Sequence, residues 1–474
     1  MRTLSIRWDD RGTPPYEQQL RKCLCTYRSK SLGGSPSGLR FRTSTDQPPD
    51  PASHERCIAL TDAYNPADYH RLFVSYTVSL FGSLLASGVV AWIAMTRVHV
   101  HGTSMGLLLG AASATAAVVA FTVGSKVDRW RKRLVLLRLD ILCAVAVLSL
   151  AIAMRVGHMS LLHLWLVDSI ELSSAILVTS ATAPLLKVVA ADRLDWANGR
   201  QEAVFWTAQL AGPPLGGFIT SAIGPEWTLL GNSLSFCLSA VSIAQIRTAC
   251  EPSSPPKSSN SVMVLLGLKT IWANRPLQLL YINAQLFGVP QLAISPVLAL
   301  FLVQELGLSA WQYGLVLGLP CAGGVLAGLL TRRILNSVPR KWLLKTAGVG
   351  RCLWLLPIAA VPAGPHVMLS VLCLETATVF SAGIFNPAFA TTRIRIAPAD
   401  RLSAVVSSWG ASTRMFQPVG TFAGGALMDV IGARSVFAIA GILCLMSMIP
   451  LMMIKNDEID TIDTPHVVTK GTPT

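Results

Sequence analysis

Long apolar runs separated by short polar turns fill the chain from about residue 70 onward. Each run is long enough to cross the roughly 30 Å hydrocarbon core of a bilayer as an α-helix, which rises about 1.5 Å per residue. The pattern therefore predicts an all-α membrane protein with twelve transmembrane helices. We place them at about 71–95, 103–124, 134–154, 160–183, 202–222, 227–246, 277–304, 312–331, 342–362, 367–390, 403–427 and 434–454.

Two polar stretches divide the chain. Residues 1–66 are basic and rich in Pro, Gly and Ser, a composition typical of disorder. Residues 247–275 contain a run of Pro and Ser between two apolar runs, which predicts a linker. We therefore expect five parts: a disordered tail 1–66, a six-helix bundle 67–246, a cytoplasmic linker 247–275, a second six-helix bundle 276–454 and a C-terminal tail 455–474.

An internal repeat relates the two predicted bundles. The tripeptide Asp192-Arg193-Leu194 recurs 208 positions later as Asp400-Arg401-Leu402. At the same offset Gly212 pairs with Gly420, Gly216 with Gly424 and Gly217 with Gly425. The repeat predicts two pseudo-symmetric six-helix bundles with the same orientation in the membrane.

Composition and charge agree with a membrane protein. The 474 residues are 52% hydrophobic and only 14% charged, against about 25% charged in soluble domains. The formal charge of +14 is expected to lie in cytoplasmic loops that face anionic lipid, and it does not indicate binding of a nucleic acid. With the N-terminus inside, the outer loops hold only Arg97, Arg155 and Arg434, whereas the short inner loops hold most of the other bases. This bias predicts a multi-pass protein of the cell membrane with both termini in the cytoplasm.

One short basic turn lies between the second and third predicted helices. It contains Gly124, Asp128, Arg129, Lys132 and Arg133. A positive-inside loop accounts for the bases, but not for the glycine and the aspartate at fixed offsets. The spacing resembles the signature loop G-x-x-x-D-R-x-x-R-R of the major facilitator superfamily. The resemblance implies a carrier of two six-helix halves, gated on its cytoplasmic side by this loop.

A second motif lies in the fifth predicted helix, at Gly212, Pro213, Gly216 and Gly217. It resembles the superfamily motif G-P-x-x-G-G, which is associated with exporters that exchange substrate for protons. Glycines allow two helices to pack closely and proline bends a helix. Generic packing of small residues is the alternative interpretation.

Further stretches, among them Ala191–Asn198 and Asn232–Phe236, resemble the branch that contains macrolide efflux pumps and the enterobactin exporter. That branch often has an acidic residue after the glycine of its first helix. Here Ser83 follows Gly82, so the expected proton carrier must be sought elsewhere.

Ionisable side chains inside apolar runs are costly and are therefore candidates for function. Asp168 and Glu171 lie three residues apart, on one face of the fourth helix. Glu375 lies at nearly the equivalent position of the second half, and Arg414 is its candidate partner, or the partner of an anionic group on the substrate. These four residues are the candidates for proton coupling or substrate binding; a solvated outer vestibule is the alternative for the acidic pair. Arg138, Asp140 and Arg351 are interpreted as structural residues of the cytoplasmic edge.

Other chemistries find little support. No phosphate-binding G-x-x-x-x-G-K-[ST] loop occurs, and the G-x-S-x-G match at Gly102–Gly106 follows a short loop rather than a strand. The histidines and cysteines lack ligand spacing. We therefore expect no enzyme, no cofactor and no metal.

The combined interpretation is a monomeric secondary active transporter that works by alternating access. The resemblance implies proton-coupled efflux of a bulky hydrophobic or amphipathic small molecule, such as a drug, a macrolide or a siderophore-like compound. Its partners would be that substrate, protons and the lipid bilayer. A metabolite importer or uniporter of the same fold, and a membrane receptor or sensor that transports nothing, remain as alternatives.

Overall fold

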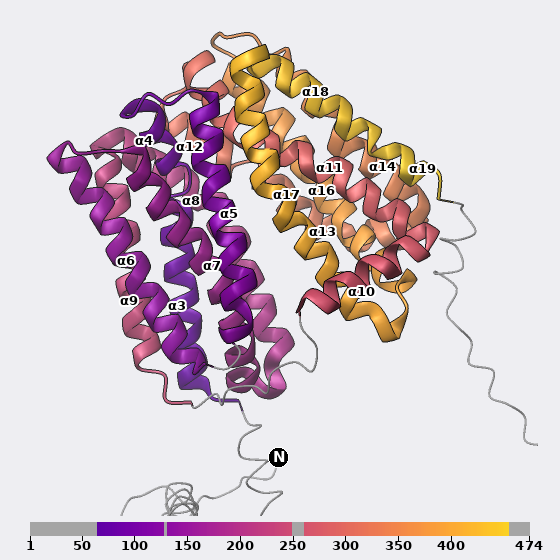
Figure 1. Cartoon of the computed structure of the whole chain (residues 1–474), viewed down its shortest axis with the longest axis horizontal. Coiled ribbons are helices and arrows are strands. Elements are labelled where there is room, and N and C mark those ends of the chain that lie inside the picture. Colours follow the sequence, from indigo (N-terminus) through magenta and orange to yellow (C-terminus); the bar gives the residue numbers. More distant parts are fainter. Residues whose placement is uncertain (1–63, 128–129, 249–259, 455–474) are drawn as a thin grey trace, which may run out of the picture. The chain divides into compact units, whose positions relative to one another are not determined.

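Helices make up every regular element of residues 64–127, 130–248 and 260–454, the part of the chain that this computed structural model describes (Figure 1). No strand occurs in these ranges. A helix satisfies its backbone hydrogen bonds within one segment, which is what long apolar runs require in a membrane. Residues 1–63 and 455–474 of the two predicted tails, 249–259 of the predicted linker, and Asp128 and Arg129 lie outside the described residues.

The first half, residues 64–248, begins with a broken helix. Its break lies at Gly88, whose φ of +80° is the left-handed conformation that glycine adopts readily. The elements are α3 (Pro66–Leu85), α4 (Val89–Thr96), α5 (Gly102–Val127), α6 (Lys132–Val156), α7 (Leu161–Ala190), the 3₁₀ turn η1 (Ala191–Arg193), α8 (Leu194–Ile223) and α9 (Pro225–Ala244).

The second half, residues 260–454, has more interruptions. Its elements are α10 (Asn260–Ala273), α11 (Arg275–Leu300), the π-helical turn η2 (Phe301–Glu305), α12 (Ala310–Gly318), α13 (Cys321–Ser337), α14 (Arg340–Leu353), α15 (Leu355–Ala359), α16 (Val367–Ile396), the 3₁₀ turn η3 (Ala399–Arg401), α17 (Leu402–Ile431), α18 (Ala433–Met446) and α19 (Met448–Met452). Helix α10 lies within the range predicted as a linker. It packs on α17, where Ser408 Oγ donates to the Val264 carbonyl oxygen at 2.7 Å.

Nine segments of the described residues are long and apolar enough to cross a membrane. One of them, Leu161–Ile223, is 63 residues long and contains α7, η1 and α8. Helix α17 and the pair α14 and α15 are not among the nine.

The sequence repeat is also a repeat of local structure. The turn η3 begins and ends 208 positions after η1, and α17 begins and ends 208 positions after α8. Helix α18 begins 208 positions after α9. Equivalent sequence positions in the two halves thus occupy equivalent places on their helices.

The hydrophobic core is continuous between the halves at one end of the helices and divided at the other. One large cluster draws on both halves, for example Ile93 and Leu150 of the first with Leu300 and Phe437 of the second. A second cluster contains only second-half residues and a third only first-half residues. The third includes Tyr69, near the start of α3. The halves therefore share a core at the end where α3 finishes, and have separate cores at the end where α3 begins.

Two glycine-lined seams join the halves. Along α5 and α17, which lie side by side (Figure 1), a Cβ atom on Gly425 would lie 2.2 Å from the carbonyl oxygen of Gly102. Along α8 and α12, a Cβ atom on Gly314 would lie 2.4 Å from the carbonyl oxygen of Pro213. Gly314 is the repeat equivalent of Gly106, which also packs against Gly425. The glycines of the G-x-S-x-G match therefore serve helix packing.

Candidate functional site

A cavity of about 800 Å³ lies among helices of both halves. This volume is in the range of sites for small molecules, roughly 300–1,000 Å³. The first half contributes residues of α3 to α9, and the second half contributes residues of α11, α12, α15 and α16.

Helix α3 gives the cavity a wall of hydroxyl groups. Ser75, Ser79 and Ser83 line it, each four positions after the last, so they share one face of the helix. Ser87 lines the cavity from the turn that follows α3. Ser83, where the related branch often has an acid, is thus part of the cavity lining.

Four carboxylic acids line the cavity. Asp168 and Glu171 come from α7 and Glu375 from α16, so the structure brings three predicted site residues together. The fourth is Asp140 of α6, which the sequence interpretation left at the cytoplasmic edge. Among the residues that the structure describes, no lysine, arginine or histidine lines this cavity.

The four acids differ in their partners. Glu171 accepts a hydrogen bond from Asn232 Nδ2 at 2.9 Å. Asp140 accepts one from Ser239 Oγ at 2.5 Å, and Ser239 in turn contacts Ser75 at 2.8 Å. Asp168 and Glu375 form no hydrogen bond or ion pair within the described part of the chain. Two of the acids are thus already engaged, and two are available to a ligand.

Arg414 lies elsewhere. Its side chain is exposed on α17, and it is not part of the cavity lining. The structure does not bring this arginine to Glu375. The prediction that Arg414 partners Glu375 is therefore wrong for this structure.

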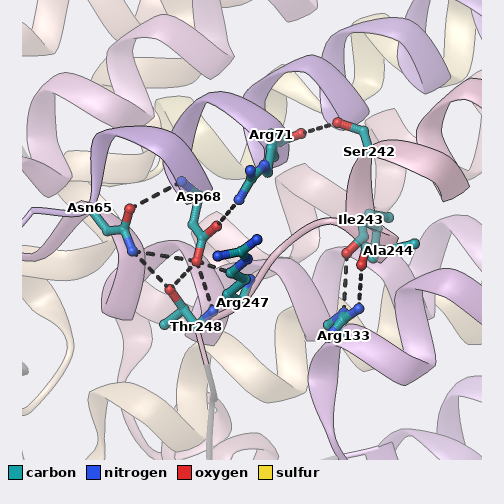
Figure 2. Close-up of polar contacts among 9 residues, drawn as sticks. All are labelled: Asn65, Asp68, Arg71, Arg133, Ser242, Ile243, Ala244, Arg247 and Thr248. Carbon is teal, nitrogen blue, oxygen red and sulfur yellow. Dashed lines mark hydrogen bonds and ion pairs between the residues drawn. The ribbon is translucent and has the colours of Figure 1, made fainter. Parts of the chain in front are cut away.

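The signature turn is described in part. Gly124 belongs to α5, and Lys132 and Arg133 begin α6. The buried Lys132 donates from Nζ to the carbonyl oxygen of Val127 at 2.8 Å. Arg133 donates to the carbonyl oxygens of Ile243 and Ala244 (Figure 2). Both bases therefore neutralise the carbonyl ends of neighbouring helices, where positive charge is favourable.

A buried aspartate beside this turn was not predicted. Asp68 is only 2% exposed. It accepts hydrogen bonds from the backbone N–H groups of Arg247 and Thr248 at 3.1 and 2.7 Å and pairs with Arg71 at 2.8 Å (Figure 2). It thereby ties the start of α3 to the chain leaving α9. The signal was present in the sequence, because Asn65 followed by Pro66 is a typical helix start, and Asn65 does cap α3.

The glycine motif of α8 faces two helices at once. A Cβ atom on Gly216 would lie 1.7 Å from the carbonyl oxygen of Leu85 in α3. One on Gly217 would lie 2.5 Å from the carbonyl oxygen of Ala310 in α12. Gly212 packs against Leu84, and Pro213 lines the cavity. The motif therefore lies between the cavity and the α8–α12 seam.

At the opposite end of the helices from Asp68, a carboxylate joins the two halves. Asp429, near the end of α17 and beyond the predicted span 403–427, accepts hydrogen bonds from the backbone N–H groups of Gly102 and Thr103 at 2.8 and 2.7 Å, and one from the Thr103 hydroxyl. Burial raises the pKa of Asp429, but these hydrogen bonds outweigh it and the pKa lies below its ordinary value. The negative charge also faces the positive end of the α5 dipole.

Comparison with known proteins identifies the family. The family model of the Major Facilitator Superfamily matches residues 72–405, more than half of the chain. The chain belongs to this superfamily. Together with the nine apolar segments among its described residues, this makes it a multi-pass membrane protein.

Two kinds of curated transport protein resemble parts of the chain. The multidrug efflux pump Tap of Mycobacterium tuberculosis is 29% identical over 259 residues, which cover 52% of this chain and 58% of the pump. The folate-biopterin transporter of Synechocystis sp. is 28% identical over 202 residues, covering 41% of this chain and 40% of that protein. The chain thus spans little more than half the length of the curated pumps that it matches.

Solved superfamily structures have the same fold. A bacterial homologue of the iron transporter ferroportin, in an inward-facing state, superposes with a TM-score of 0.64 at 15% identity, covering 82% of this chain and 99% of that one. A POT family transporter in complex with a thioalcohol-conjugated peptide gives a TM-score of 0.65 at 11% identity, covering 84% and 96%. At these identities the likeness concerns the fold alone.

Proposed function

We propose that this protein is a secondary active transporter that exports a bulky hydrophobic or amphipathic small molecule in exchange for protons. The observation that supports this best is the cavity of about 800 Å³ lined by acids and placed among helices of both halves. A site in this position can face each side of a membrane in turn when the halves rock against each other.

The proposal includes twelve membrane crossings in two bundles of six. The nine candidate segments become twelve when Leu161–Ile223 is divided at η1, and when α17 and the pair α14 and α15 are added. The matching bounds of α8 and α17 support two copies of one six-helix unit.

The excess of basic residues in the predicted inner loops orients the chain with the start of α3 in the cytoplasm. The divided core then lies on the cytoplasmic side, and the shared core and Asp429 lie outside. In this orientation the structure corresponds to a state that is closed outward.

Export is favoured over import by the likeness to the Tap pumps and by the glycine motif of α8. An importer or uniporter is the alternative within the fold, since the folate-biopterin transporter is also similar. A receptor that moves nothing is the alternative from another class. The large cavity between the halves favours transport over that alternative.

Proton coupling rests on the cavity acids. Glu171, Asp168 and Glu375 are carboxyl groups that reach the cavity from helices of different halves. A carboxyl group that exchanges a proton for substrate can couple the two fluxes, and its neutral form lowers the cost of crossing the membrane core.

Transport by purified protein in liposomes, with and without a pH gradient, tests the proposal. The probes are fluorescent amphipathic compounds that include cationic, neutral and anionic members. We expect pH-driven accumulation of at least one probe. One of the variants Asp168→Asn, Glu171→Gln and Glu375→Gln, the one that removes the true proton carrier, should lose this accumulation. The same variant should still exchange the probe down its own gradient. Asp195→Asn, which removes an exposed carboxylate on α8, is the matched control. Full pH-driven transport in all three variants would refute proton coupling through these acids. Failure to transport any probe would refute the proposal that the protein transports amphipathic compounds.

A further inference from the structure

The charge of the cavity lining is one-sided. Four carboxylic acids line it, and none of the described residues that line it is a lysine, arginine or histidine. An acid enclosed without a compensating partner is costly in a membrane protein and usually meets an opposite charge. Here the described part of the chain does not supply that opposite charge.

Two of the acids already have partners within the protein. Asn232 donates to Glu171 and Ser239 donates to Asp140. Asp168 and Glu375 have no hydrogen-bond or ion-pair partner among the described residues, although both reach the cavity from opposite halves of the chain. Their carboxylates are therefore the groups that a ligand can pair with.

The rest of the lining selects the kind of ligand. Aliphatic side chains are the largest group in it, and Tyr76, Phe236 and Tyr313 add aromatic rings. Aromatic faces attract cations within about 6 Å. An organic cation with a large apolar body can satisfy both the rings and the two acids.

A metal ion fits the same acids poorly. Within the described residues, no three His, Cys, Asp or Glu side chains lie close enough together to hold a metal ion. Ca²⁺ and Mg²⁺ need about six or more oxygen ligands at short range, whereas one organic cation needs a single carboxylate and an apolar surface.

We propose that the cavity binds amphipathic organic cations, and that Asp168 and Glu375 are the carboxylates that recognise their positive charge. The proposal rests on the transport function proposed above and narrows its substrate class. It excludes anionic, siderophore-like compounds, because an anion would face four acids and no base of the described lining. Like charges placed close together cost on the order of several kcal/mol, which is enough to suppress binding of the wrong partner.

Two ions of nearly the same shape and opposite charge test it. Tetraphenylphosphonium is a cation and tetraphenylborate an anion, and their binding to the full chain in detergent can be measured by titration calorimetry, with protein-free micelles as the blank. We expect at least tenfold tighter binding of the cation. We also expect its affinity to fall at least tenfold in a double variant, Asp168→Asn with Glu375→Gln, and to be unchanged in Asp195→Asn.

Equal binding of both ions, preference for the borate, binding of neither, or full cation affinity in the double variant would each overturn the assignment. If the double variant does not yield folded protein, the single variants Asp168→Asn and Glu375→Gln take its place, because each removes one recognised charge. Failure of the charge assignment can be told apart from failure of the transport proposal. If the protein transports neutral or anionic probes but does not bind the phosphonium, only the charge assignment is refuted. A chain that binds the phosphonium but moves no probe refutes transport only.

Discussion

Single side chains in this protein are placed by neighbours that are distant in the sequence. Asp68 is the best example, because its backbone donors come from residues 247 and 248, at the far end of the first half. A buried carboxylate that accepts several N–H groups is worth more than a neutral acceptor at the same place. The start of α3 and the exit of α9 are therefore held together by one residue.

The variant Asp68→Asn tests this tie. An amide accepts on one side only, so its NH₂ group would face donors in either orientation: the N–H groups of Arg247 and Thr248, or the guanidinium group of Arg71. We expect a loss of roughly 1–3 kcal/mol, the usual cost of an unsatisfied buried polar group, which appears as a melting temperature several degrees lower in detergent. The exposed Asp195→Asn is the control, and equal melting of both variants would show that the tie contributes nothing.

The acids of the cavity show what could be predicted at this scale. The sequence indicates Asp168, Glu171 and Glu375 as candidates, because an ionisable group inside an apolar run is costly and is seldom present without a function. Their partners were beyond prediction, since the contact of Asn232 with Glu171 depends on how α9 is rotated against α7. Arg414 faced the same limit, because only the packing of α17 decides that its side chain is exposed.

At the scale of helices, close packing depends on the absence of side chains at a few positions. Helix α8 contains Pro213 and Pro214 and is nevertheless continuous from Leu194 to Ile223. Its glycines let α3 approach within contact of the backbone. The motif is thus a packing surface, and its spacing of four follows from one turn of helix.

Gly216→Ala should disrupt this surface. The added methyl group would lie 1.7 Å from the Leu85 carbonyl oxygen, so α3 and α8 must move apart. Overpacking of this kind costs about 1–3 kcal/mol, and we expect a lower melting temperature and slower transport.

Gly199→Ala is the matched control, because Gly199 belongs to the same helix and a Cβ atom added there would meet no atom within 4 Å. It should be neutral, or stabilising by up to about 1 kcal/mol from helix propensity. If the two alanine variants melt together, close packing at Gly216 does not matter.

The same scale explains which helices were predicted well. Apolar runs located the long helices, but some ends were wrong by several residues. Helix α7 ends at Ala190 rather than 183 and α8 begins at Leu194 rather than 202, because both helices continue into polar sequence. The break at Gly88 was missed, because glycine is common in membrane helices and its φ depends on the contacts of α4. Asp68 was missed with it, since the first helix was expected to begin near residue 71 and begins at Pro66.

For the whole molecule, the two seams are alike in sequence but differ in their polar contacts. The α5–α17 seam ends in the carboxylate of Asp429, whereas the equivalent position of α8 is Ser221. The α5–α17 seam is therefore joined by a carboxylate, whereas no hydrogen bond between α8 and α12 occurs in the part of the chain that the structure describes. Sequence could not predict which end of the molecule is closed, because the same residues must fit both states of a carrier.

Asp429→Asn should loosen the α5–α17 seam. We expect a longer distance between spin labels placed at Leu107 on α5 and Val430 on α17, both exposed, and more molecules open at that end. Ser221→Ala, at the equivalent position of α8, should leave the distance unchanged. Unchanged distances in both variants would rule out a fastening role for Asp429.

The pH dependence of this tie has a defined sign. The pKa of Asp429 is lowered in the folded protein, so the tie is present above the ordinary range of a carboxyl group and is lost as the pH falls through the lowered pKa. The labelled distance should therefore be constant near neutral pH and lengthen only in acid.

The hydroxyl wall of α3 has a consequence for the breadth of what the cavity accepts. A serine hydroxyl can donate or accept a hydrogen bond and can rotate to do either. Ser75 and Ser87 already form hydrogen bonds, to Ser239 and to the Leu84 carbonyl oxygen. The hydroxyls of Ser79 and Ser83, which also line the cavity, can therefore pair with either a donor or an acceptor of a bound molecule. This wall therefore discriminates little between ligands of different shape, whereas the acids on other helices of the cavity select for charge.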